Sequence, residues 1–138
     1  MGVGVMNGKI ATGEIEDDAD KTTPLAMAEP VRRITTRDIL VPASGQRLLQ
    51  WMENTQTGAL RLRAGLPADW RTGNKTGTGR APGTTNKCND VAITFPPAKA
   101  PIIISTYFDS GEYPDQTEDR HQAVVAKVGR IAADWAMR

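Results

Sequence analysis

The stretch Trp70-Arg71-Thr72-Gly73-Asn74-Lys75-Thr76-Gly77-Thr78-Gly79-Arg80 decides how we interpret this chain. It predicts a short strand that ends in small residues and carries one cation, Lys75, near its middle. Lys75 supplies positive charge and Thr76 a hydroxyl, while Gly77 leaves the backbone bare. An anionic ligand could therefore lie along the strand edge and use main-chain N–H groups. The alternative is an ordinary strand end before a turn, because three residues alone are a weak motif.

Length and composition indicate one ordinary globular domain. The 138 residues are 39% hydrophobic and 24% charged, with a net charge of +1, so nothing argues for a nucleic-acid or membrane-surface partner. The single cysteine, Cys88, excludes an intrachain disulfide, and its own role stays open. One His and one Cys do not support a zinc site, and we expect no metal or cofactor.

Residues 1–20 form a Gly-rich and acidic segment that predicts no regular element. Its start lacks the basic region and the long apolar region of a signal peptide. The acidic cluster comprises Glu14, Glu16, Asp17, Asp18 and Asp20. Such carboxylates could perform acid–base chemistry or bind a cation, but dense like charge is more typical of a solvated loop.

Three helices are predicted before the strands, over residues 23–35, 44–54 and 59–64. Thr23 can cap the first helix and Pro24 fits its first position. Pro30 should kink or end that helix, because proline removes one of its hydrogen bonds. Trp51 shares the apolar face of the second helix, which favours a core position over a ligand platform.

Three strands follow over residues 70–78, 91–95 and 102–108, and a helix over residues 116–136 ends the chain. Residues 96–101 predict the loop of an antiparallel hairpin. The run 102–104 is apolar on both faces, as expected for a strand covered by helices on both sides. His121 lies beside charged neighbours in the last helix, which favours a surface group over a proton shuttle. This order predicts an α+β fold with an antiparallel sheet flanked by helices.

Several stretches together resemble class A serine β-lactamases, in the order and near the spacing of that family. They are Asp20-Lys21-Thr22-Thr23-Pro24-Leu25-Ala26-Met27-Ala28, Leu49-Gln50-Trp51-Met52-Glu53, Arg61-Leu62-Arg63-Ala64-Gly65-Leu66-Pro67-Ala68-Asp69-Trp70, Lys75-Thr76-Gly77-Thr78-Gly79, Thr84-Thr85-Asn86, Asn89-Asp90-Val91-Ala92 and Ala100-Pro101-Ile102. The Lys-Thr-Gly element is a signature of this family. The resemblance covers residues 21–138 and implies the C-terminal half of the fold.

The resemblance also implies roles at the strand. Lys75 and Thr76, with the bare backbone of Gly77, correspond to the binders of the β-lactam carboxylate. The backbone N–H of Thr78 stands where the family places one of two oxyanion-hole donors, each worth about 3 to 4 kcal/mol in serine hydrolases. Arg61 matches an arginine that reaches the same carboxylate from beneath the strand in one branch of the family. The alternative for Arg61 is a cation on a helix surface.

Other family elements do not occur in the sequence. Ser44, Ser105 and Ser110 are the only serines, none has Lys three residues later, and Ser-Asp-Asn does not occur. In the family, a glutamate that deacylates the enzyme precedes the position of Pro24, and at that spacing this chain has Asn7. We assign the role to neither Glu14 nor Glu16. Residues 85–90 are a few residues too long for the family's strand start, which predicts a bulge or a longer turn.

Without the nucleophile, covalent acyl transfer has no attacking atom, so we expect the chain alone to be inactive. Three interpretations remain open. The chain is a portion of a β-lactamase that needs a complementing N-terminal half to hydrolyse β-lactams, a non-catalytic binding scaffold, or a self-associating chain whose copies complete one another's sheets. The family is typically periplasmic or secreted, but the chain itself does not indicate a location.

Overall fold

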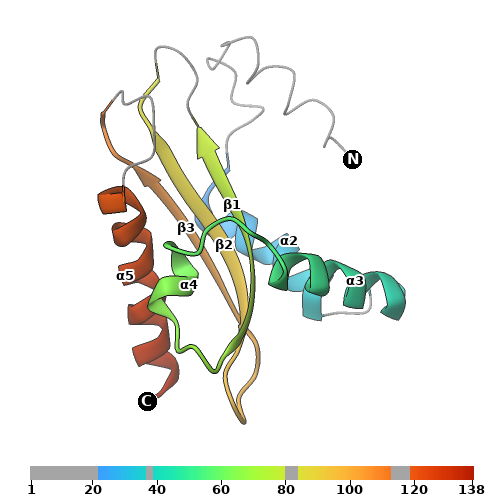
Figure 1. Cartoon of the computed structure of the whole chain (residues 1–138). Helices are drawn as coiled ribbons and strands as arrows, with labels where there is room; N and C mark the ends of the chain where they lie inside the picture. The colour runs from blue at the N-terminus through green and yellow to red at the C-terminus, as the bar shows by residue number, and fades with distance from the viewer. Residues whose placement is uncertain (1–21, 37–38, 80–83, 113–118) are drawn as a thin grey trace.

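The computed structural model describes residues 22–36, 39–79, 84–112 and 119–138, and Figure 1 traces its elements. In chain order these are α2 (Pro24–Thr36), α3 (Pro42–Glu53), α4 (Leu62–Gly65), β1 (Arg71–Gly79), β2 (Lys87–Phe95), β3 (Ile102–Asp109) and α5 (Asp119–Ala136). The acidic cluster of residues 14–20 and the position of Asn7 lie outside the described residues. The arrangement is the predicted α+β fold.

The described strands form one antiparallel sheet in the order β1-β2-β3. The predicted hairpin across residues 96–101 is confirmed, since β2 pairs with both neighbours. β2 begins at Lys87, four residues before the predicted start at residue 91. Lys87 pairs with Gly79 on one side and with Asp109 on the other, so backbone pairing extends the strand through a polar segment. The pairing is unbroken from Lys87 onward, so a bulge within residues 87–90 is wrong, while the alternative of a longer turn involves residues 80–83, outside the described residues.

Helices cover the sheet on its two faces. α4 and α5 lie on one face, while α2 packs against β3 and α3 against β1 on the other (Figure 1). Helices therefore cover β3 on both sides, as predicted for the run 102–104, although only Ile104 of this run is fully buried. The main core lies on the α4–α5 face. Its members are Leu62, Leu66, Trp70, Cys88, Ala92, Ile104, Val125, Ala133 and Ala136.

Two glycines allow α4 and α5 to pack backbone against backbone. A Cβ atom built at Gly65 would lie 1.9 Å from the carbonyl oxygen of Ala126, and one at Gly129 would lie 2.4 Å from that of Leu62. Real Cβ atoms do not approach this closely, so only glycine permits the contact. The contact fixes α4, and the residue that precedes it, against the long terminal helix.

The helix boundaries correct several predictions. The Thr23 cap is confirmed, since its Oγ1 accepts a hydrogen bond from the backbone N–H of Ala26 at 3.1 Å. α2 continues through Pro30 to Thr36, because packing against β3 supports the helix beyond the missing hydrogen bond. α3 begins at Pro42 rather than at residue 44, since proline suits the first helical turn. The third predicted helix shortens to Leu62–Gly65.

The exposure of two side chains, Trp51 and His121, was predicted wrongly. Trp51 is 66% exposed rather than in the core, because α3 contacts the sheet through Met52 and Glu53, which lie against Gly73. His121 is only 4% exposed, and its ring lies 5.9 Å from that of Phe108, so it is not a surface group. In both cases the helix has the predicted type, but its rotation against the sheet depends on tertiary packing.

Candidate functional site

The site predicted from sequence lies in the outer half of β1, which is an edge strand of the described sheet. Lys75 is exposed and pairs across the sheet with Val91. A Cβ atom at Gly77 would meet only Asn89, at 3.5 Å, so the other side of this backbone is open. An edge strand also leaves about half of its N–H and C=O groups unpaired. A ligand can therefore reach both the Lys75 ammonium and the strand backbone.

The two threonines of the motif are held from the α4 side of the sheet. Thr76 Oγ1 lies 3.0 Å from the hydroxyl of Thr57, in the segment before α4. Thr78 Oγ1 accepts a hydrogen bond of 2.7 Å from Nη2 of Arg61. Since side chains alternate along a strand, Lys75 projects from the opposite face of β1. The motif thus presents its cation on one face and its hydroxyls on the other.

Arg61 lies beneath β1 and is 5% exposed, so the alternative of a surface cation is wrong. Its Nη1 donates to the carbonyl oxygens of Gly77 at 3.2 Å and Asn89 at 2.7 Å. Nε is buried and has no hydrogen-bond partner. The guanidinium therefore ties β1 to β2 directly behind Gly77 and Thr78, and it brings a permanent positive charge under the motif.

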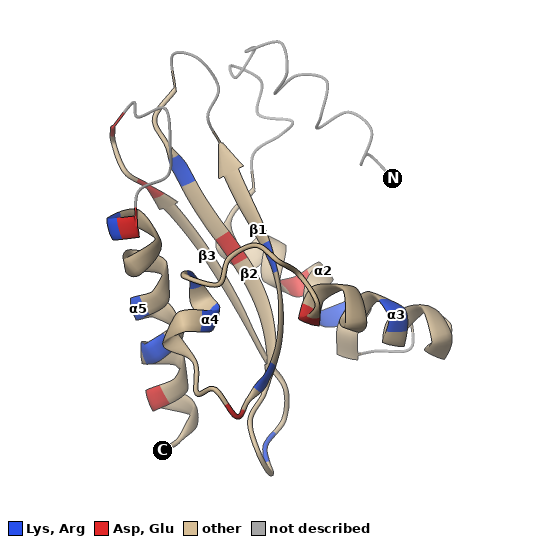
Figure 2. Cartoon of the chain, in the orientation of Figure 1, with Lys and Arg blue, Asp and Glu red and all other residues tan. Residues whose placement is uncertain are grey.

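A buried carboxylate that the sequence analysis did not single out supports this arrangement. Asp90 is 1% exposed; its Oδ2 accepts the backbone N–H of Leu62 at 3.2 Å, and its Oδ1 accepts Nδ2 of Asn74 at 3.0 Å. Asn74 Oδ1 in turn accepts Nη2 of Arg63 at 2.8 Å. Figure 2 shows this acidic segment of β2 in the middle of the sheet, near basic segments of α4 and β1.

The network links the residues on either side of the motif. Leu62 directly follows Arg61, and Asn74 directly precedes Lys75, so one carboxylate holds both neighbours in place. Burial raises the pKa of Asp90, while the Asn74 amide, the Leu62 N–H and the arginines Arg61 and Arg63 oppose that rise. No direct sequence signal pointed to this role, because Asp90 precedes the strand predicted over residues 91–95 and enters β2 only in the structure.

The described site offers hydrogen-bond donors and positive charge, and no described serine is its immediate neighbour on the sheet. Ser44 lies in α3 and Ser110 follows β3, away from the motif. Ser105 lies on β3 with a buried Oγ that has no partner. Its strand neighbour Val91 separates it from Lys75, which places the two backbones about 10 Å apart at the usual strand spacing.

Within the described ranges, no group of three His, Cys, Asp or Glu side chains is arranged to hold a metal ion. In the same ranges, no helix has the length and apolar character needed to cross a bilayer. Thr84, in one of the stretches that resemble the family, lies just before β2, and the adjoining residues 80–83 are outside the described part of the chain.

Comparisons with known proteins give consistent results. A model of the β-lactamase enzyme family matches residues 3–136, which includes most of the segment that the sequence analysis left unassigned. β-Lactamase CTX-M-8 of Citrobacter amalonaticus is 39% identical over 118 residues, and β-lactamase CTX-M-25 of Escherichia coli is 40% identical over 118 residues. These matches cover 86% of this chain but 38% of each relative.

Solved structures show the same relationship. An ancestral (GNCA) class A β-lactamase aligns with a TM-score of 0.76 and 44% identity, covering 88% of this chain and 44% of that one. A putative class A β-lactamase, PenP of Rhodopseudomonas palustris, aligns with a TM-score of 0.75 and 37% identity. The chain thus spans less than half the length of the relatives it matches, and its fold corresponds to the C-terminal part of theirs. The chain belongs to the β-lactamase enzyme family.

Proposed function

We propose that this chain supplies the carboxylate-binding and oxyanion strand of a β-lactam site. In this proposal Lys75 and Thr76 bind the ligand carboxylate beside the bare backbone of Gly77, and Arg61 adds positive field from beneath the strand. The backbone N–H of Thr78 is the oxyanion donor. The observation that carries the proposal is the placement of Arg61, whose guanidinium bonds to Gly77 and Thr78 behind an open strand edge.

Hydrolysis of the β-lactam amide bond then requires groups from a second segment. The Ser-x-x-Lys and Ser-Asp-Asn elements of the family do not occur in these 138 residues. An oxyanion donor without a positioned nucleophile gives little catalysis. The partner of this chain is therefore a complementing segment that carries these elements, and the ligand is a β-lactam bound between the two.

Complementation in trans tests this proposal. The chain is mixed with the part of a class A relative that carries Ser-x-x-Lys and Ser-Asp-Asn, and hydrolysis of a chromogenic cephalosporin is followed. We expect no turnover by either piece alone and measurable turnover by the mixture. Lys75→Ala should reduce turnover by the mixture at least tenfold. The control Lys127→Ala, an exposed position on α5, should leave it unchanged.

Two outcomes would contradict the proposal. Turnover by the chain alone that disappears with Lys75→Ala would mean that a nucleophile is already present. Equal turnover by mixtures with Lys75→Ala and with Lys127→Ala would show that Lys75 is not part of the site. Loss of complementation with both variants would indicate a general folding defect, which circular dichroism of each variant detects independently.

A second candidate function is a self-associating scaffold. It is favoured by the exposed apolar side chains on α5, where Ile131 is 67% and Trp135 is 66% exposed. Large exposed apolar groups at helical spacing promote association. Light scattering distinguishes the candidates, because a discrete oligomer that Trp135→Gln dissociates favours the scaffold. A monomer that binds the complementing segment favours the β-lactam site.

A further inference from the structure

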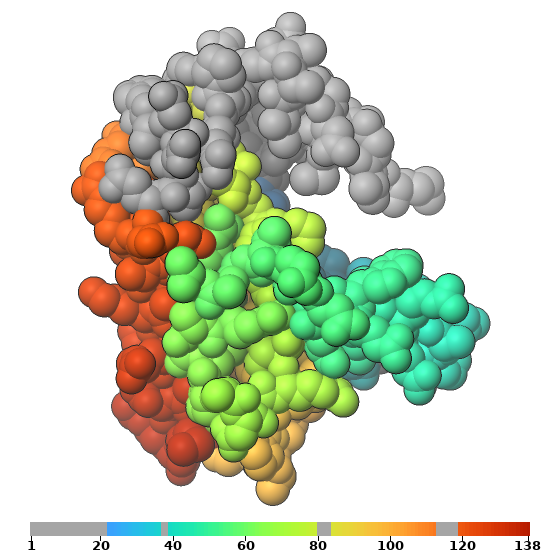
Figure 3. All heavy atoms as spheres, in the orientation of Figure 1, coloured from blue at the N-terminus to red at the C-terminus, as the bar shows by residue number. Residues whose placement is uncertain are grey.

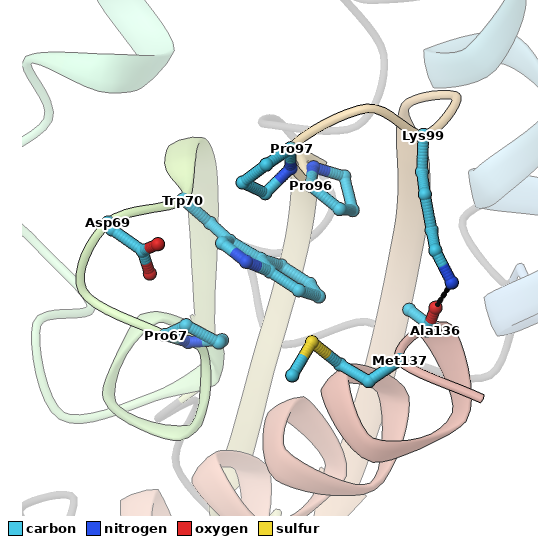
Figure 4. Close-up of a pocket in the computed structure, with 8 residues that line it drawn as sticks. All are labelled: Pro67, Asp69, Trp70, Pro96, Pro97, Lys99, Ala136 and Met137. Carbon is cyan, nitrogen blue, oxygen red and sulfur yellow. Dashed lines mark hydrogen bonds between the residues drawn. The ribbon is translucent and has the colours of Figure 1, made fainter.

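A cavity lies beside the start of β1, at the end of the sheet opposite to Thr78 and Gly79. Its volume is about 210 Å³, and Figure 4 shows the side chains that line it. They come from the segment before β1, from the β2–β3 loop and from the end of α5: Pro67, Asp69, Trp70, Pro96, Pro97, Lys99, Ala136 and Met137. Trp70 and Lys75 are five residues apart along the strand, or about 17 Å. The cavity is therefore separate from the candidate site.

Most of the cavity wall is apolar and is held by short turns. The buried Trp70 indole forms the centre of the wall, and its backbone N–H donates to the carbonyl of Pro67 at 3.1 Å. The opposite wall is a proline-rich turn, in which the Lys99 N–H donates to the carbonyl of Pro96 at 3.3 Å. Ala98 within this turn has a φ of 57°, a left-handed conformation that alanine rarely adopts. A planar apolar group fits between an indole and proline rings of this kind.

The size of the cavity sets the size of the ligand. An apolar cavity of about 150 Å³ accommodates benzene. A cavity somewhat larger than this holds one aromatic ring with a short substituent. Met137 at its rim is exposed and flexible, so its thioether can adapt to the edge of such a ring.

The two charged side chains that line the cavity, Lys99 and Asp69, lie on opposite sides of it and differ in their contacts. Lys99 Nζ donates to the carbonyl oxygen of Ala136, which holds this cation at the C-terminal end of α5, where the helix dipole favours positive charge. Asp69 is exposed and forms no hydrogen bond or ion pair with the described residues. Figure 4 places its carboxylate on the indole-nitrogen side of Trp70, away from Lys99. The cavity thus has a cation at its α5 end and a carboxylate on the indole-nitrogen side of Trp70, so an ammonium group is favoured on the Asp69 side.

We propose that this cavity binds small aromatic cations, with the ring against Trp70 and the proline turn and the ammonium group beside Asp69. The apolar wall supplies most of the affinity, and the carboxylate selects for charge. An aromatic anion oriented in the same way is disfavoured by the carboxylate of Asp69. The proposal is independent of the β-lactam site, because it uses none of the residues of that site.

Tryptophan fluorescence of the full chain tests this proposal. Trp51 and Trp135 are both exposed, so Trp51→Phe with Trp135→Phe leaves Trp70 as the only tryptophan without disturbing the core. Benzylammonium, benzyl alcohol and benzoate are then titrated at low salt. We expect benzylammonium to bind about fivefold more tightly than benzyl alcohol, the size of an exposed ion pair, and benzoate most weakly.

Matched variants identify the residues responsible. Asp69→Asn should make benzylammonium and benzyl alcohol bind equally, while Asp134→Asn, an exposed carboxylate elsewhere on α5, should keep the preference. Ala136→Leu should fill the cavity and abolish binding of both, and Lys75→Ala should change nothing. Equal binding of the ammonium and the alcohol by the unaltered chain would overturn the proposal. So would a preference that survives Asp69→Asn, or binding that survives Ala136→Leu.

Discussion

The two faces of the sheet are built differently. On the α4–α5 face, helix backbones touch through glycines, and a carboxylate is buried with its partners. On the other face, α2 and α3 contain no buried residue, and Figure 3 shows α3 projecting from the body of the molecule. The comparison teaches that the proposed anion site is anchored from its tightly packed rear, while its front is comparatively open.

The largest difference in the free energy of unfolding is expected when glycine is replaced by alanine once on each face of the sheet. Gly65→Ala would place a methyl group 1.9 Å from the backbone oxygen of Ala126, so α4 and α5 must separate. We expect a loss of about 3 kcal/mol or more in the free energy of unfolding. Gly45→Ala in α3 meets nothing within 4 Å and should stabilise the chain by about 0.5 to 1 kcal/mol. Urea unfolding measures both, and equal effects would refute the contrast between the faces.

Truncation of a large apolar side chain on each face gives the next effect. Leu62 is fully buried between α4 and the sheet, so Leu62→Ala should cost about 3 kcal/mol. Trp51 has the larger side chain but is exposed, so Trp51→Ala should change the free energy of unfolding by less than about 0.5 kcal/mol. A large loss from Trp51→Ala would show that α3 packs on another surface in solution.

The buried carboxylate predicts a pH dependence of stability. Burial raises the pKa of Asp90 in the folded state, so its contribution to stability is fully present below its unfolded pKa of about 3.9 and is lost as the pH rises through the folded value. Asp90→Asn removes this titration but also one acceptor for Leu62 or Asn74. The cost of Asp90→Asn should therefore be largest near pH 4 and decrease toward pH 7, as urea unfolding across this range would reveal.

The smallest effect on stability is expected from an exposed carboxylate, Asp109. Its pKa is lowered rather than raised, so its pH dependence is opposite to that of Asp90. Hydrogen bonds from Lys87, Thr85 and the backbone N–H of Gly111 lower the pKa of Asp109 to about 2. Its contribution to stability is present above the unfolded pKa and is lost as the pH falls through about 2. Lys87→Met should raise the pKa of Asp109 toward its ordinary value, which a carboxyl titration by NMR would detect. An unchanged pKa would mean that Thr85 and Gly111 suffice.

The types of the helices and strands and their order along the chain were predictable from the sequence. The hairpin at residues 96–101 and the apolar run 102–104 carry local signals that do not depend on distant residues. The start of β2 was not predictable in this way, because residues 87–90 are mostly polar and are held in the sheet by bonds to strands distant in sequence. A strand with neighbours on both sides can include residues that its own composition would exclude.

The environments of single side chains were less predictable. Helical periodicity placed Trp51 on an apolar face and could not tell which face meets the sheet. The charged neighbours of His121 suggested exposure, but the ring turns toward Phe108. Arg61 was identified through its resemblance to the family, whereas Asp90 was missed as its support. Its partners Leu62 and Asn74 are distant in sequence and meet it only in the folded chain.

The shared carboxylate of Asp90 also constrains how this chain can diverge. Because one side chain holds both the start of α4 and the residue before Lys75, a substitution that repositions Arg61 also disturbs the most densely packed part of the chain. Variants with altered ligand preference should therefore arise more readily at the open front of β1 than at its rear. In an evolutionary lineage, we expect Asp90, Asn74 and Arg61 to change together or not at all.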